Sequence, residues 1–308
     1  IMEAYVHGVS TRSVDDLVAA LGVDSGISKS EVSRICAGLD REIAAFRTRT
    51  LTHTTFPYVF CDATFCKVRV GAHVVSQALV VATGVSAEGT REVLGTAVGD
   101  SESFEFWREF LTSLKSRGLA GVHLVISDAH AGLKSAVAQQ FSGSSWQRCR
   151  VHFMRNLHGA VSAKHAPAVT AAVKTVFAHT DPDEVAAQWD TVADSLAASF
   201  PKVAAMMNEA KADVLAFTAF PRAHWQKIWS NNPIERLNKE IKRRADVVEI
   251  FPNPAAFLRL ATAVVIEAHD EWQVTRRYLS EISMAELRNV IATKQAVDKP
   301  LAEQRQIA

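Results

Sequence analysis

The order in which strand-like and helix-like segments follow one another between residues 56 and 151 constrains the fold most. Apolar residues alternate or run continuously in some segments, as in strands, and recur every three or four positions in others, as in helices. The predicted order is three strands, a helix, a strand, a helix and a strand, at residues 58–70, 73–83, 92–98, 103–117, 122–127, 132–141 and 146–151.

Short turns between the first three predicted strands indicate an antiparallel meander, and the later strands are separated by helices. This is the order of the RNase H-like nuclease fold, an α/β fold with a mixed sheet. In that arrangement the first and fourth strands lie side by side. We therefore expect Asp62, in the first strand, to lie close to Asp128, directly after the fourth.

Helical segments precede and interrupt the predicted sheet. Two N-capped amphipathic segments, at 10–22 and 27–46, resemble a helix-turn-helix. An ordinary helical hairpin for packing or dimerisation explains them equally well. In a helix-turn-helix, the DNA-facing residues would be Lys29, Ser30, Ser33 and Arg34.

The predicted boundaries divide the chain into five parts. They are a helix-turn-helix-like DNA-binding or dimerisation segment (1–52), the first part of the sheet domain (53–152), an all-helical insertion (153–223), the second part of the sheet domain (224–280) and a polar tail that is either frayed or partner-dependent (281–308).

Bulk composition favours a globular protein. Hydrophobic residues make up 48% of the 308 residues, and the net charge is +1, which neither supports nor excludes a nucleic-acid partner. We expect a cytoplasmic protein without a membrane span, because no apolar run is long enough and no secretory signal is present. The four cysteines do not resemble a disulfide framework. Cys149 and His152 have the spacing of half a zinc site, but no second such pair occurs.

Three acidic residues have the placement that metal-assisted phosphodiester chemistry requires. Asp62 interrupts an apolar strand, where an unpaired carboxylate is costly to bury. Asp128 ends another strand, although such a residue alone is equally well explained as a helix cap. Glu235 lies at the start of a basic helix after the insertion. Together they predict a site for two metal ions acting on a phosphodiester.

Lys and Arg outnumber acids around Glu235, so this helix is either a salt-bridged solvent face or a surface for DNA phosphates. Trp225 and Trp229, four residues apart before the helix, either pack in the core or stack on bases. The candidate phosphate-binding residues are Arg155, Arg236, Lys239, Lys242, Arg243 and Arg244.

Several motifs, in order, resemble bacterial insertion-sequence transposases of the Mutator-like group, which are DDE transposases. The resemblance runs from residue 5 to about 280. The matching stretches are residues 7–17, 28–33, Cys-Asp-Ala-Thr at 61–64, Ser-Asp-Ala-His-Ala-Gly-Leu at 127–133, residues 146–156, Asn-Asn-Pro-Ile-Glu-Arg-Leu-Asn at 231–238 and Ile-Phe-Pro-Asn at 250–253.

The resemblance implies that Asp62, Asp128 and Glu235 form the catalytic, metal-binding triad, with Mg²⁺ as the cofactor and Mn²⁺ as a substitute. It also marks Cys149 and His152 as a family motif: His152 contacts either DNA or the active site, and Cys149 packs. The implied activity is cleavage at terminal inverted repeats followed by 3′-hydroxyl strand transfer.

The implied partners are transposon ends and target DNA in a bacterial nucleoid, bound by a homodimer or larger assembly. Family members begin with a longer N-terminal region, so we expect this chain, which starts at Ile1, to be a fragment. Two rival functions remain: a stand-alone RNase H-like nuclease, and a catalytically silent DNA-binding protein that acts through the helix-turn-helix alone.

Overall fold

A mixed sheet of six strands forms the centre of the computed structural model, which describes residues 29–305. Strands β1, β2 and β3 pair in antiparallel fashion, whereas β4 runs parallel to β1 and β5 parallel to β4. The sheet order is β3-β2-β1-β4-β5, and β6 pairs with the far end of β1. The strands are β1 (Tyr58–Val70), β2 (His73–Val85), β3 (Arg91–Gly99), β4 (Leu124–Ser127), β5 (Ser145–Arg148) and β6 (Ile250–Phe251). The expected pairing of the first and fourth strands is confirmed.

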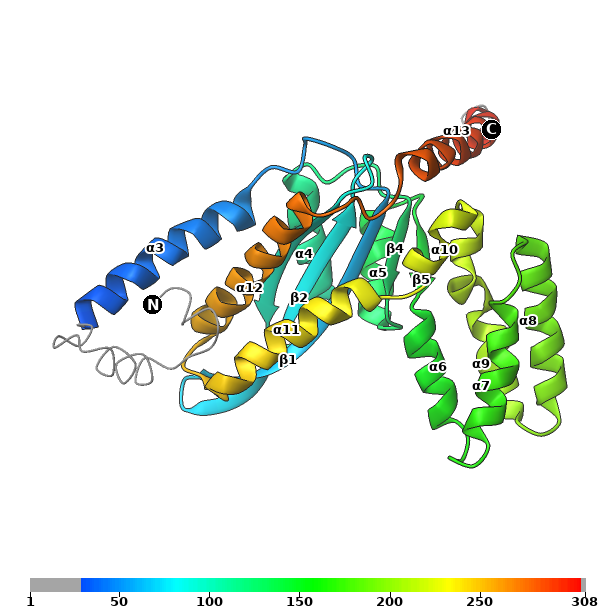
Figure 1. The fold of residues 1–308 in the computed structure, drawn as a ribbon, viewed down its shortest axis with the longest axis horizontal. Coiled ribbons are helices and arrows are strands. Elements are labelled where there is room, and N and C mark those ends of the chain that lie inside the picture. The colour runs from blue at the N-terminus through cyan, green and yellow to red at the C-terminus, as the bar shows by residue number, and fades with distance from the viewer. Residues whose placement is uncertain (1–28, 306–308) are drawn as a thin grey trace.

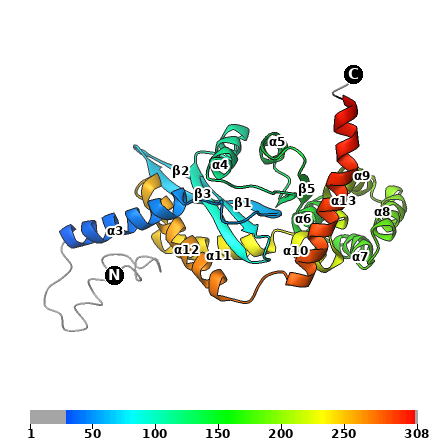
Figure 2. The same cartoon turned by 90° about the horizontal axis from the view of Figure 1, so that it is seen from above.

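Helices cover both faces of this sheet (Figures 1 and 2). One face carries α4 (Phe104–Ser116) and α5 (Ala131–Gln140), and the other carries α11 (Asn232–Val248) and α12 (Pro254–Val274). Figure 2 shows the sheet between these two pairs. Helix α3 (Lys29–Thr48) lies along α12. The layers thus leave the middle of β1, at Cys61, next to the start of α11.

Strand β1 divides its side chains between two cores, because successive residues of a strand point to opposite faces. Tyr58 and Phe60 pack with residues of α11 and α12, whereas Val59 and Cys61 pack with residues of α4 and α5. Asp62 continues the series of Tyr58 and Phe60. The strand therefore directs this carboxylate toward α11, where Asn238 donates a hydrogen bond to it.

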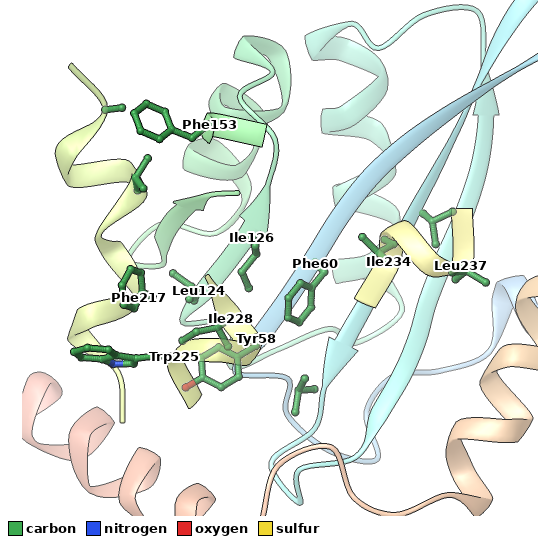
Figure 3. Packing of buried hydrophobic residues seen from close by; sticks show 14 of the residues in the cluster. Tyr58, Phe60, Leu124, Ile126, Phe153, Phe217, Trp225, Ile228, Ile234 and Leu237 are labelled. Atoms are coloured by element: carbon green, nitrogen blue, oxygen red, sulfur yellow. The ribbon is translucent and has the colours of Figure 1, made fainter. Parts of the chain in front are cut away.

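Between β5 and α11 the described chain forms only helices, as predicted for the insertion. They are α6 (Arg150–Gly159), α7 (Ala166–Val176), α8 (Pro182–Ala197), α9 (Pro201–Val214), two short 3-10 turns (Ala216–Ala219 and Arg222–His224) and α10 (Trp225–Ile228). Pro182 and Pro201 open their helices, where the missing N–H breaks no hydrogen bond. The insertion shares a core with the sheet: Phe153 and Phe217 belong to the same apolar cluster as Tyr58 and Ile126 (Figure 3).

Some elements differ from the sequence prediction. The first predicted helix, at 10–22, lies outside the described residues, and the second is present as α3. Strand β5 ends at Arg148, and α6 begins where the strand was expected to continue. The expected frayed tail instead contains helix α13 (Glu281–Arg305), which buries Met284 and Leu287. Among the described residues, we find no helix long and apolar enough to cross a membrane.

Candidate active site

Asp62 and Asp128 lie at the same level of the sheet. The last paired residues of β1 and β4 are Phe60 and Ile126, whose side chains share one core. Asp128 directly follows the last residue of β4, and its charge acts on Asp62, so the two carboxylates lie near each other where β4 ends.

Asp62 is partly buried and strongly perturbed. Burial raises its pKa to about 7, and the negative charges of Asp128 and Glu235 add to this effect. Two hydrogen bonds oppose the rise: one from the backbone N–H of Ala63, and one from Asn238 Nδ2 to Asp62 Oδ2, at 2.8 Å. Three acids therefore lie close enough to repel one another, an arrangement that favours a bound cation.

Asn231 fixes where α11 and Glu235 begin. Its side-chain Nδ2 donates to the carbonyl of Cys61, at 2.9 Å, next to Asp62 in the chain. Its backbone N–H donates to Cys149 Sγ, at 3.3 Å, and its carbonyl accepts from the N–H of Glu235, at 3.0 Å. One buried asparagine thus ties the helix that carries Glu235 directly to the strand that carries Asp62.

Cys149 connects the same helix to β4. Its backbone N–H donates to the carbonyl of Ser127, at 2.7 Å, next to Asp128. The entry and exit of the insertion also meet here, because the N–H of Arg150 donates to the carbonyl of Trp229, at 2.9 Å. We call the hydrogen-bonded chain through Cys61, Asn231, Cys149 and Ser127 the neck. It joins a direct neighbour of Asp62 to a direct neighbour of Asp128, and Asn231 in turn bonds the start of the Glu235 helix.

His152 faces Glu235 from the first turns of α6. Its Nε2 lies 3.8 Å from Glu235 Oε1, and both side chains are about one-fifth exposed. Cys149 is completely buried. Burial raises the pKa of its thiol, and backbone N–H groups of His152, Asn231 and Val151 oppose that rise. The motif of Cys149 and His152 therefore borders the acidic cluster, with the cysteine packed and the histidine next to Glu235.

The residues present fit a hard divalent cation. Carboxylate oxygens are the ligands that Mg²⁺ prefers, and Asp62, Asp128 and Glu235 supply them from three separate elements. Glu235 Oε1 is buried and has no hydrogen-bond partner within the described structure. A buried carboxylate oxygen without a partner is costly, and a cation at this position would satisfy it.

Four residues near the acids were not predicted as site residues, although Asn231, Asn238 and Arg148 lie in stretches that carry the family resemblance. Asn231 and Asn238 act through hydrogen bonds to distant strands. Glu102, before α4, is close enough to Asp128 that the two charges interact, although burial is the main cause of its raised pKa. Arg148, at the end of β5, has a pKa lowered by burial and is attracted by Asp213 and Asp128. The contacts of such side chains depend on how distant strands and helices pack, so they cannot be predicted from local sequence.

Most of the candidate DNA-binding side chains are exposed. Those of Lys29 and Ser30 lie outside the described side chains, Arg34 is exposed on α3, and Trp229 is half-buried, with the Arg150 guanidinium 3.8 Å from its ring centroid. The exposed basic residues near Glu235 are Arg155, Arg236, Lys239, Lys242 and Arg243, the last of which forms an ion pair with Glu240.

Two of these candidate assignments are corrected by the structure. Trp225 is 2% exposed, and its Nε1 donates to the carbonyl of Phe220 at 2.8 Å, so its ring packs in the core (Figure 3). Arg244 is 6% exposed and forms ion pairs with Glu240 and Glu267. Core packing and these internal ion pairs remove both side chains from a DNA-facing surface.

Comparison with known proteins finds similar sequences along nearly the whole chain. The profile described as "Transposase, Mutator family" matches residues 1–275. The chain is 46% identical over 279 residues to the transposase for insertion sequence element IS1081 of Mycobacterium tuberculosis, covering 91% of this chain and 67% of that protein. It is 37% identical over 283 residues to the transposase for IS256 in transposon Tn4001 of Staphylococcus aureus, covering 91% and 72%. It is 36% identical over 296 residues to the transposase for ISRM5 of Rhizobium meliloti, covering 96% and 74%.

Proposed function

The chain belongs to the Mutator family of transposases, and from this premise we propose that it is a DDE transposase in which Asp62, Asp128 and Glu235 bind two Mg²⁺ ions. The proposed reaction is cleavage of DNA at the terminal inverted repeats of an insertion sequence, followed by attack of the released 3′-hydroxyl on target DNA. Water and then the DNA hydroxyl act as nucleophiles, so no covalent intermediate with the protein forms.

One observation carries the proposal: the neck holds the neighbours of Asp62 and Asp128 and the helix of Glu235 in a single hydrogen-bonded chain. Two-metal catalysis requires carboxylates from separate elements to converge within a few ångströms. Burial, followed by the charges of Asp128 and Glu235, raises the pKa of Asp62 to about 7, and a carboxyl with a perturbed pKa beside other acids supports a functional site.

Each of these residues has a distinct part in the proposed site. Asp62, central among the acids, is the carboxylate shared between the ions. Asn238 holds Asp62 Oδ2 and so fixes the rotamer of that carboxylate. Asn231 sets the position of Glu235 at the first turn of α11. When bound, the ions would activate the attacking water and polarise the scissile phosphate.

The order of the sheet supports an RNase H-like catalytic domain. On one side of β1 lie the antiparallel strands β2 and β3, and on the other lie the parallel strands β4 and β5. Exposed Arg236, Lys239 and Lys242 on α11, together with Arg155 on α6, give the acids a positive border that suits DNA phosphates. Two transposon ends would require at least a dimer, and α3 would be the second helix of a helix-turn-helix.

The test is incubation of the purified chain with labelled DNA carrying an element end, in Mg²⁺ or Mn²⁺. We compare Asp62→Asn and Glu235→Gln with Asp246→Asn, a matched control because Asp246 is an exposed acid on the same helix as Glu235. Nicking and joining should fall by more than about 100-fold in the two site variants and persist in the control.

Other outcomes identify the rival functions. Cutting without joining would favour a stand-alone nuclease. DNA binding that is equal in parent and variants, with no cutting by any of them, would favour a catalytically silent DNA-binding protein and refute the proposal.

A further inference from the structure

A second group of metal-binding atoms meets beside the acidic cluster. The ligand atoms of Cys149, His152 and Glu235 all lie within 4.8 Å of one another. Cys149 and His152 come from the start of α6, and Glu235 comes from the first turn of α11. The half zinc site in the sequence is thus joined by a carboxylate that lies far along the chain.

The sulfur of Cys149 lies where backbone N–H groups partly offset the cost that burial places on a thiolate. It is the residue before α6, and it accepts the N–H of Asn231, the residue before α11. The amino-terminal ends of two helices therefore meet at this atom, and the positive ends of their dipoles stabilise negative charge there. A completely buried thiolate still needs a counter-charge, which a metal ion would provide.

The other two donors have unsatisfied atoms. Glu235 Oε1 and His152 Nδ1 are both buried without a hydrogen-bond partner in the described structure. His152 Nε2 lies 3.8 Å from Glu235 Oε1, which is too long for a hydrogen bond and leaves the pair unjoined. Sulfur, imidazole and carboxylate are the ligands of Zn²⁺, which commonly binds three such side chains and keeps one position open.

We propose that Cys149, His152 and Glu235 form a Zn²⁺ site that is distinct from the Asp62 and Asp128 carboxylates but shares Glu235 with the catalytic centre. Binding releases the thiol proton of Cys149 to solvent. Because Zn²⁺ holds Glu235, the hard-metal centre loses one ligand, and Zn²⁺ inhibits the Mg²⁺-dependent reaction. The inhibition rests on the proposed function, whereas the zinc site itself does not.

The site is tested first without DNA. Co²⁺ is added to the full, Mg²⁺-free chain, because a cysteine-bound Co²⁺ gives an ultraviolet charge-transfer band. We expect this band in the parent, its loss when Zn²⁺ displaces Co²⁺, and its absence in Cys149→Ser. Cys66→Ser, which removes another buried thiol, from β1, is the matched control and should keep the band.

A second variant guards against misfolding of Cys149→Ser. His152→Gln leaves the buried thiol in place and should weaken Zn²⁺ binding by at least about tenfold, while circular dichroism reports an unchanged helix content. No band in the parent, a band that survives in Cys149→Ser, or unchanged Zn²⁺ affinity in a folded His152→Gln would each overturn the site.

The inhibitory consequence is measured separately, by adding Zn²⁺ to the nicking assay in excess Mg²⁺. The parent should lose activity at the Zn²⁺ concentration that displaces Co²⁺, and Cys66→Ser should lose it equally. A Co²⁺ band in a protein that never cuts DNA would refute the transposase proposal and leave the zinc site standing. Full activity with the site saturated by Zn²⁺ would overturn the sharing of Glu235.

Discussion

Replacing Asp62 by Asn should stabilise the metal-free protein at neutral and alkaline pH. The carboxylate is partly buried, faces two other acids and has its pKa raised to about 7 by burial and by the charges of Asp128 and Glu235. Asn has nearly the same shape and no charge. Its oxygen can still accept the hydrogen bond that Asn238 Nδ2 donates to Asp62. The substitution therefore removes the repulsion and keeps the main contact.

The sign and size of this stability change follow from the pKa of Asp62 in the unfolded chain and in the folded protein. Between pH 3.8, the ordinary pKa of an aspartate, and about pH 7, the folded protein holds a proton that the unfolded chain has released. Parent stability therefore falls as pH rises through this window and is level above it. Each pH unit corresponds to about 1.4 kcal/mol. Because Asp62 keeps some contact with solvent, we expect Asp62→Asn to be more stable by about 3 kcal/mol near pH 8.

The assay is urea unfolding in the presence of EDTA, at several pH values between about 4 and 8. The stability difference between variant and parent should be close to zero at the acid end and grow toward neutral pH. Asp246→Asn, on the exposed side of α11, should show no such trend. A difference that stays constant with pH, or a variant less stable than the parent near pH 8, would refute the electrostatic reasoning.

Two further predictions concern residues near Glu235. Trp225→Ala should lower the free energy of unfolding in urea by about 3–5 kcal/mol, because Trp225 is only 2% exposed. Trp229→Ala should cost distinctly less, because Trp229 is only half-buried, and equal losses would contradict the packing. Lys242→Gln should lower the salt dependence of DNA binding by about 0.9 in log–log slope, measured by fluorescence anisotropy, whereas Arg244→Gln should lower stability and leave that slope unchanged, because Arg244 is held by Glu240 and Glu267.

Local patterns predicted the sheet well, because strand and helix periods are encoded residue by residue. Strand β1 begins and ends where its apolar alternation does, and the order of elements predicted that it would pair with β4. The direction of Asp62 followed from the same alternation. For Trp225, of the two interpretations of the tryptophan spacing, the structure selects core packing.

Long-range contacts limited the prediction of the site. Asn231 bonds Cys61 across 170 residues and Cys149 across 82 residues, and no local pattern records such pairings. Glu235 could not be assigned to Cys149 and His152 from spacing, because a zinc-site motif pairs ligands close in sequence and Glu235 lies far along the chain. Helix α13 was not predicted, because its polar composition resembles a tail, although Met284 and Leu287 are buried in its first two turns.

The neck has a consequence for how chains of this kind can differ in length. Beside the neck, the hydrogen bond from the N–H of Arg150 to the carbonyl of Trp229 holds the two ends of the insertion together. Closing a loop twice as long costs only about 0.6 kcal/mol more in chain entropy. We therefore expect residues added in the turn between α7 and α8 to leave the acids in place, because the two ends of the insertion stay joined. The spacing between Asn231 and Glu235 cannot change in this way, because the hydrogen bond of one helical turn joins the two residues.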